Sequence, residues 1–167
     1  MNTVPRLLVA FIGLTASISH AAEPAFINTR VMSFDTATTL AITAAKACRK
    51  MGYQVTASVV DRNGTLLAVA RDPLSGTHTV EISRLKAFTS ATFQTATLTM
   101  TQDEFKALRD APDVLLIGGG VPVLVGGQFY GAVGVSGAPA KKITGDIDDD
   151  CARQGIKAIE EALEFAE

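Results

Sequence analysis

Apolar residues recur at spacings of three and four in several stretches of the chain, which is the pattern of helices with one buried face. In the first of these stretches the apolar positions run from Ala37 to Met51, with Asp35 as the expected N-cap. Thr101 and Glu104 form a capping box that announces another helix. The pattern predicts four helices, at about residues 35–51, 77–94, 101–111 and from 146 onward.

Short runs rich in β-branched residues, bounded by turn residues, predict five strands. Asn63-Gly64 and Gly126-Gly127 are two-residue turns of the kind that close tight hairpins. The second turn sets a register in which Val123 pairs with Tyr130. This register places Val121, Val123, Tyr130 and Ala132 on one face and Leu124, Phe129, Val133 and Val135 on the other. The predicted strands span residues 55–62, 65–70, 114–117, 121–125 and 128–135.

The first 21 residues have the pattern of an export signal. Arg6 supplies a positive charge, and residues 7–18 form an apolar core that is too short to span a bilayer. Ser19 and Ala21 are small residues at the two positions that a signal peptidase reads. We expect cleavage after Ala21 and a periplasmic or secreted protein, with an uncleaved anchor as the alternative.

Removal of this segment limits the chemistry that the protein can perform. The remaining 146 residues (167 minus 21) fit a single domain, which we place at 35–167 after a flexible lead-in at 22–34. His20 leaves with the signal, so one chain retains only His78 and cannot build a multi-histidine metal site. The net charge becomes 14 minus 17, or −3, without a basic stripe. Nucleic acid is therefore not expected as a partner, and neither is a membrane after cleavage.

The only two cysteines, Cys48 and Cys151, lie on the apolar faces of the first and last predicted helices. If these helices pack antiparallel on one face of the sheet, the two residues can reach the Cα separation of about 4.4 to 6.8 Å that a disulfide requires. An oxidising compartment favours this bridge, and we expect it to form. The alternative is two separate buried thiols.

An acidic run, Asp146 to Asp150, crowds the start of the last predicted helix. Acids at this position are favoured by the positive end of the helix dipole. A calcium loop would need alternating oxygen ligands and a distal Glu, and this pattern is missing. We therefore interpret the run as helix capping.

Five blocks of sequence stand in a specific order and spacing: VVDRNGTLLAVARD (59–72), HTVEISRLKAFTSATFQTAT (78–97), GGGVPV (118–123), GAVGVSGAP (131–139) and DDDCARQG (148–155). Together they resemble the GlcG/HbpS family, which also occurs as the C-terminal domain of PduO-type proteins. The resemblance covers about residues 37–163 and implies a profilin-like α+β fold, with an antiparallel five-stranded sheet and flanking helices. It also implies a homo-oligomer and haem as the ligand.

Haem needs a flat apolar slot, an axial donor and positive charge near its propionates. His78 is the expected axial ligand, with Tyr53 and Tyr130 as the other candidate donors. A capping or surface role is the alternative for His78. The chain has no CxxCH motif, so attachment would be non-covalent. The basic residues nearest to His78 in the sequence are Arg71, Arg84 and Lys86.

The residues give less support to catalysis. A single histidine cannot be assigned to a Ser-His-Asp triad, and Lys86 is the one amine for which a lowered pKa is expected. We assign no catalytic residue. The expected function is haem binding by an exported protein, for uptake, storage, sensing or degradation, and the alternative is an accessory protein or enzyme of small-molecule catabolism.

Overall fold

The computed structural model describes residues 24–166, so the predicted signal peptide lies outside the described residues. Residues 24–33 form no helix or strand, and α1 begins at Phe34. The regular elements are α1 (Phe34–Lys50), β1 (Thr56–Val60), β2 (Leu66–Arg71), α2 (Thr79–Phe93), η1 (Thr99–Thr101), η2 (Asp103–Leu108), β3 (Gly120–Val125), β4 (Gln128–Ser136), α3 (Asp146–Lys157) and α4 (Glu160–Glu164).

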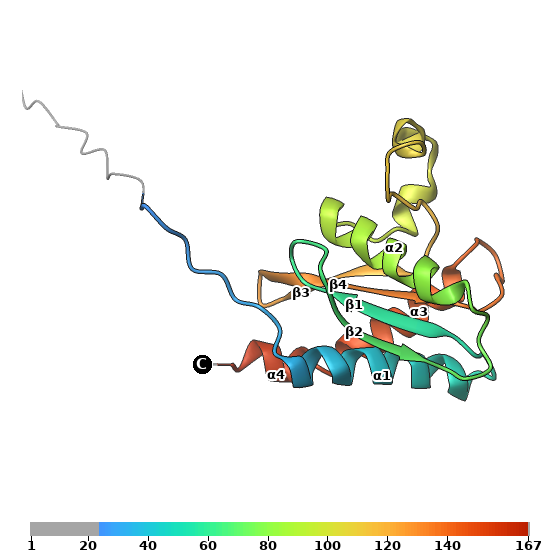
Figure 1. Cartoon of the computed structure of the whole chain (residues 1–167), viewed down its shortest axis with the longest axis horizontal. Coiled ribbons are helices and arrows are strands. Elements are labelled where there is room, and N and C mark those ends of the chain that lie inside the picture. The colour runs from blue at the N-terminus through green and yellow to red at the C-terminus, as the bar shows by residue number, and fades with distance from the viewer. Residues whose placement is uncertain (1–23, 167) are drawn as a thin grey trace, which may run out of the picture.

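The fold is α+β and has three layers (Figure 1). The four strands form one antiparallel sheet in the order β2-β1-β4-β3. Helix α2 covers one face of this sheet, whereas α1 and α3 cover the other. The larger core lies on the α1 and α3 side, and a smaller cluster around Ala87 and Phe129 lies beneath α2. Among residues 24–166, no helix is both long and apolar enough to cross a membrane.

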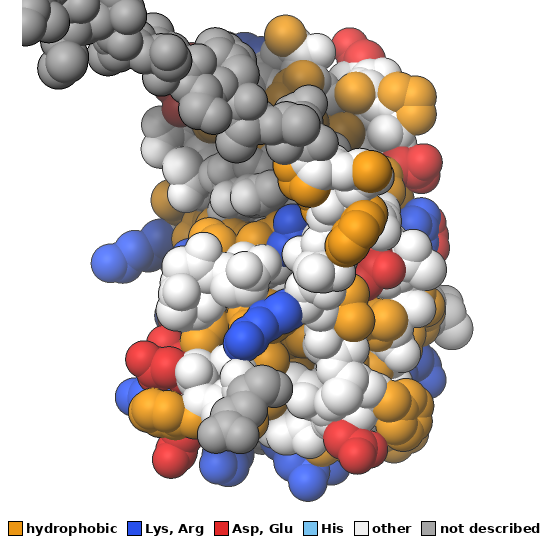
Figure 2. Space-filling view, turned by 90° about the vertical axis from the view of Figure 1, so that its left-hand side faces the viewer, with side chains coloured by type: hydrophobic (Ala, Val, Ile, Leu, Met, Phe, Trp, Pro, Cys, Tyr) orange, Lys and Arg blue, Asp and Glu red, His pale blue; other side chains and the backbone are white. Residues whose placement is uncertain are grey.

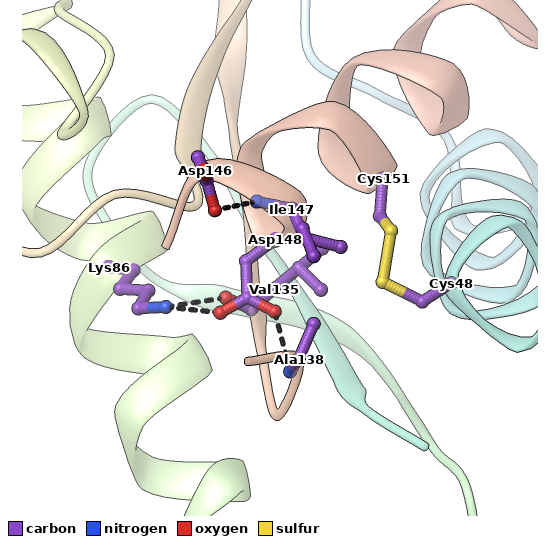
Figure 3. The surroundings of a disulfide bond; sticks show 8 residues. All are labelled: Cys48, Lys86, Val135, Ala138, Asp146, Ile147, Asp148 and Cys151. Atoms are coloured by element: carbon purple, nitrogen blue, oxygen red, sulfur yellow. Dashed lines mark hydrogen bonds and ion pairs between the residues drawn. A yellow bond between two sulfur atoms is a disulfide. The ribbon is translucent and has the colours of Figure 1, made fainter. Parts of the chain in front are cut away.

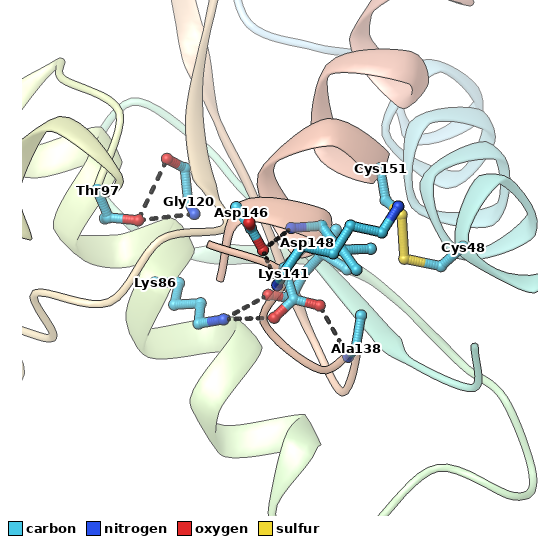
Figure 4. Close-up of polar contacts among 11 residues, drawn as sticks. Cys48, Lys86, Thr97, Gly120, Ala138, Lys141, Asp146, Asp148 and Cys151 are labelled. Atoms are coloured by element: carbon cyan, nitrogen blue, oxygen red, sulfur yellow. Dashed lines mark hydrogen bonds and ion pairs between the residues drawn. A yellow bond between two sulfur atoms is a disulfide. The ribbon is translucent and has the colours of Figure 1, made fainter. Parts of the chain in front are cut away.

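The predicted fifth strand, residues 114–117, is wrong, and the sheet has four strands rather than five. At Gly120, the first residue of β3, the N–H and the carbonyl of the outer edge are already hydrogen-bonded to Thr97. Thr97 donates its N–H to the carbonyl of Gly120 at 2.8 Å. Its hydroxyl accepts the N–H of Gly120, also at 2.8 Å (Figure 4). The segment pairs with α2 instead, because the N–H of Leu115 donates to the hydroxyl of Thr89 at 2.8 Å.

The predicted register of the β3–β4 hairpin is correct at its turn and wrong beyond it. Val125 pairs with Gln128, but a bulge then shifts the register, so that Val123 pairs with Gly131 rather than with Tyr130. Gly131 has φ 133°, and a Cβ there would lie 2.2 Å from a backbone carbonyl of β1, which only glycine avoids. Because of the bulge, the side chains of β4 divide between the two faces of the sheet differently from the prediction. Tyr130, Val133 and Val135 belong to the larger core, whereas Phe129 and Ala132 face α2.

Two helix predictions also need correction at their N-termini. Ser33, not Asp35, is the N-cap of α1, and its hydroxyl accepts the N–H of Thr36 at 3.2 Å. The predicted helix at 101–111 is replaced by two short 3₁₀ helices, η1 and η2, neither of which has a side-chain cap. The extended backbone of Gln102, with ψ 161°, separates them, so the expected capping box does not form.

The predicted Cys48–Cys151 disulfide is confirmed, with a Cα–Cα distance of 5.5 Å (Figure 3). Both residues are fully buried. The bridge joins α1 to the second turn of α3 on one side, while Asp148, in the first turn of α3, reaches toward α2 on the other side. The start of α3 therefore connects the two helical layers.

Candidate functional site

A cavity of about 340 Å³ lies between α2 and the segment 136–145 that connects β4 to α3. One side of the cavity is lined by His78, Ile82 and Lys86. Their spacing of four residues places them on the same face of α2 and its N-cap. The remaining wall is mixed. Ile117, Ala138 and Ala140 are apolar, Ser136, Thr144 and Asp148 are polar, and Gly137 and Gly145 carry no side chain. The volume lies at the lower end of the range for small-molecule and cofactor pockets, and the share of polar side chains is higher than in most of them.

His78 lies at the rim of this cavity, at the position that precedes the first turn of α2. Its side chain is exposed and does not cap the helix. We find no hydrogen bond to its imidazole from any residue in the range 24–166. The ring nitrogens therefore stay accessible to a metal, for which neutral imidazole is the commonest protein ligand.

Lys86 and Asp148 form a buried ion pair at the base of the cavity (Figure 4). Lys86 is only 2% exposed, and its ammonium donates to Asp148 Oδ2 at 2.8 Å and to the carbonyl of Val135 at 2.9 Å. Burial lowers the pKa of Lys86 and raises the pKa of Asp148, while their mutual attraction opposes both changes. The other carboxylate oxygen of Asp148 accepts the N–H of Ala138 at 3.0 Å, which fixes the cavity wall.

Asp146 holds the rest of the connecting segment in shape. Its carboxylate accepts the backbone N–H groups of Lys141 at 3.0 Å, Lys142 at 2.7 Å and Ile147 at 2.8 Å. These hydrogen bonds lower the pKa of Asp146 to about 2. The acidic run thus has separate roles, since Asp146 binds the loop before α3 and the N–H of Ile147, whereas Asp148 lines the cavity. The N-cap itself is Gly145, without a side-chain cap.

Of the predicted binding residues, the structure brings only His78 and Lys86 to this cavity. Arg84 is on α2 but pairs with Glu81 at 2.7 Å. Arg71 donates to the carbonyl of Ser75 and lines a different cavity, against α1. These placements do not test the assignments, which stay predictions.

The two tyrosines that were the other candidate donors lie elsewhere in the fold. Tyr130 is buried in the larger core and its hydroxyl donates to the carbonyl of Leu163 at 3.5 Å. Tyr53 packs against the same core from the end of α1. Neither tyrosine lines the His78 cavity.

Asp148 and Ile117 line the cavity but were not identified as site residues from the sequence. Ile117 lies in the segment 114–117, which the sequence pattern predicts as a strand. Asp148 is separated from Lys86 by 62 residues, and its position in an acidic run resembles ordinary helix capping. One signal could have identified Asp148. A lysine inside a protein is almost always paired, so a buried Lys86 requires an acidic partner somewhere in the chain.

These residues fit a haem group in part. Ile82 and Ile117 are apolar side chains that suit the face of a porphyrin, and the free imidazole suits its iron. The other lining residues are small or polar. Basic groups for propionates are less evident, since Lys86 is already paired with Asp148. In residues 24–166 no cluster of three or more His, Cys, Asp or Glu side chains is arranged to hold a metal ion by itself.

Known proteins resemble this chain over most of its length. Residues 32–157 match the family "Haem degrading protein HbpS-like". Protein GlcG of Escherichia coli K12 is 33% identical over 109 residues, which cover 64% of this chain and 81% of GlcG. These matches agree with the resemblance on which the expected fold and ligand rest.

Solved structures show the same fold. A double mutant of HbpS from Streptomyces reticuli superposes with a TM-score of 0.74 and 31% identity, covering 86% of this chain and 98% of that one. A PduOC:haem complex gives a TM-score of 0.68 and 27% identity, covering 78% and 96%. The family match and the shared fold together show that this chain belongs to the HbpS-like family.

Proposed function

We propose that this protein binds haem non-covalently in the cavity between α2 and the segment 136–145, with His78 as the axial ligand. The observation that carries the proposal is the position of His78, which is the one histidine of residues 24–166 and lies at the rim of that cavity. The complex of the relative PduOC with haem supports haem as the ligand. Uptake, storage, sensing and degradation of haem would all begin with this binding step.

Each part of the cavity has a distinct task in this proposal. The imidazole of His78 would hold the iron, and Ile82 and Ile117 would pack against the porphyrin. The Lys86–Asp148 pair fixes the relative positions of α2 and the opposite wall. Bound haem would supply the redox chemistry of its iron.

Titration with hemin tests this proposal. Protein lacking residues 1–21 is expected to sharpen and shift the Soret band, with saturation at one haem for each chain or pair of chains. Replacement of His78 with Ala is expected to shift the band again and to weaken binding by about tenfold or more, a loss of at least 1.4 kcal/mol. Free imidazole should restore the parental band position in this variant, because it replaces the missing ligand.

The exposed Thr92, also on α2, provides a matched control, and Thr92→Ala should behave as the parent. A parental spectrum in His78→Ala would contradict the role of His78 and favour Tyr53 or Tyr130 as the donor. A parent spectrum identical to that of free hemin would contradict haem binding altogether.

We also propose that the protein is exported to the periplasm or secreted. The buried Cys48–Cys151 bridge supports this proposal, since structural disulfides persist in oxidising compartments. The protein recovered from the producing cells should begin at Ala22 when its intact mass is measured. A mass that includes residues 1–21 would contradict cleavage.

A homo-oligomer stays a prediction. The segment before α1 supports it, because Phe26, Ile27 and Val31 are 64 to 80% exposed and neighbour the exposed Phe34. Such a run of exposed apolar side chains is typical of a contact surface. Light scattering is expected to give a mass of at least two chains, and a monomeric mass at micromolar concentration would contradict this prediction.

A further inference from the structure

A second cavity, of about 410 Å³, lies between the outer surfaces of α1 and α3. It shares no lining residue with the His78 cavity. No Asp or Glu is among its lining residues, and all but one of their side chains can donate hydrogen bonds. They are Thr43, Lys46, Ala47 and Lys50 from α1, with Gln154 and Lys157 from α3.

Three solvent-exposed lysines bring positive charge to this groove, and one of them, Lys157, also lines a separate cavity together with Glu160. None of them takes part in an ion pair with a residue that the structure describes. Lys46 and Lys50 are one helical turn apart, a spacing at which like charges repel, and Lys157 faces the same cavity from α3. The helix dipole accounts for Lys50 and Lys157, which lie in last turns, but not for Lys46.

This gathering is notable because acids outnumber bases in the chain, by 17 to 15. A cluster of like charges without counter-charge opposes folding, and such local conflicts in a sequence concentrate at functional sites. A bound anion would remove the conflict. In Figure 2 the lower end of the molecule, the level at which α1 lies in Figure 1, carries basic side chains (blue) interspersed with acidic ones (red).

The two helices that form the groove cannot separate easily. The disulfide between Cys48 and Cys151 joins α1 to α3 close to the groove, since Cys48 directly follows the lining residue Ala47. The lysine backbones are therefore held at a fixed spacing before any ligand arrives. Pre-organised positions of this kind lower the entropic cost of binding.

We infer that the groove between α1 and α3 binds a compact anion of the phosphate class, carrying two or more negative charges. Lysine ammonium groups act as point charges and are common ligands of phosphate oxygens. Three lysines match a multivalent anion, whereas a single carboxylate would leave most of the positive charge uncompensated. The hydroxyl of Thr43 and the amide of Gln154 add uncharged donors at the same cavity.

Calorimetric titration with inorganic pyrophosphate, at constant ionic strength, tests this inference. The parent is expected to show saturable binding at one site, and the triple variant Lys46→Gln, Lys50→Gln, Lys157→Gln should bind at least about tenfold more weakly. The control is Lys106→Gln, Lys141→Gln, Lys142→Gln, which removes the same charge from exposed positions outside the groove and should bind as the parent. Equal weakening in both triple variants, or no binding by the parent, would overturn the inference.

The same variants distinguish two sources of the phosphate group, a lipid headgroup and a soluble compound. Sedimentation with vesicles of phosphatidic acid and phosphatidylcholine would identify a lipid headgroup if the parent is retained and the groove variant is not. Pyrophosphate binding without vesicle retention would identify a soluble phosphate compound. Hemin binding should be unchanged in the groove variant, so a failure of the anion inference is distinct from a failure of the haem proposal. A parallel loss of hemin binding in this variant would overturn the inference, because it would show that the lysines serve haem instead.

Discussion

Replacement of both Cys48 and Cys151 with Ala is expected to lower the free energy of unfolding by about 4 to 5 kcal/mol. The bridge closes a loop with a sequence separation of 103 residues. Cross-linking a loop of this size restricts the unfolded chain, and the chain-entropy model assigns about 4.7 kcal/mol to a loop of about a hundred residues. This figure is an upper value, and it is a large share of the roughly 5 to 15 kcal/mol that stabilises most proteins.

Urea denaturation followed by circular dichroism measures this effect. The matched control is the parent protein reduced with dithiothreitol, which has the same side chains in the core but lacks the cross-link. The reduced parent and the double variant should have similar midpoints, both well below the oxidised parent. A midpoint unchanged by reduction would contradict a stabilising role for the bridge.

Replacement of Lys86 with Met is expected to destabilise the fold by about 3 to 5 kcal/mol, because it leaves the carboxylate of Asp148 buried without its partner. The second variant, Lys86→Met with Asp148→Leu, removes both charges. It should recover at least half of the loss, since an apolar pair of similar volume often replaces a buried ion pair at little cost. Urea denaturation at neutral pH measures all three proteins.

The exposed pair of Lys106 with Asp103, whose side chains are 58% and 88% exposed, is the matched control. Lys106→Met should change stability by no more than about 1 kcal/mol, because water already screens that pair. A loss in Lys86→Met as small as that in the control would contradict the account of the buried pair. A double variant as unstable as the single variant would show that Asp148 has its own structural role through the N–H of Ala138.

The two predictions concern the same part of the molecule. Cys151 and Asp148 both belong to the first two turns of α3, and they point to opposite sides (Figure 3). The disulfide ties α3 to α1, whereas the ion pair ties it to α2 and to the end of β4. The segment 136–145, which forms one wall of the His78 cavity, leads directly into this part of α3, and its Ala138 donates an N–H to Asp148. The stability of α3 therefore determines the shape of the candidate site.

Local patterns in the sequence were sufficient for much of this fold. The spacing of apolar residues located α1 and α2 to within a few residues and the start of α3 at Asp146, but the single helix predicted from there is divided into α3 and α4. The two glycine-containing turns located both hairpins. The disulfide followed from one assumption about helix packing, because both cysteines lie on apolar helix faces. The helices and hairpins depend on neighbours in the chain, which a sequence pattern records directly.

The errors share a different origin, since each depends on contacts between distant residues. The apolar run 114–117 looks like a strand, but Thr97 occupies the edge of β3 that the run would need. The bulge at Gly131 follows from the close approach of β1, 71 residues earlier at Val60. The pairing of Lys86 with Asp148 likewise joins two segments that no local pattern relates. The site was therefore predicted less completely than the fold.

Magnetic resonance of the single imidazole tests the haem proposal most directly. Protein lacking residues 1–21 and carrying isotope-labelled histidine has one labelled side chain, His78, so its imidazole signals need no further assignment. Gallium protoporphyrin, a diamagnetic substitute for hemin, is added in steps. The account predicts that the His78 signals move by a large ring-current shift and reach an end point together with the porphyrin absorbance. Porphyrin that binds at saturation while the His78 signals stay in place would contradict it.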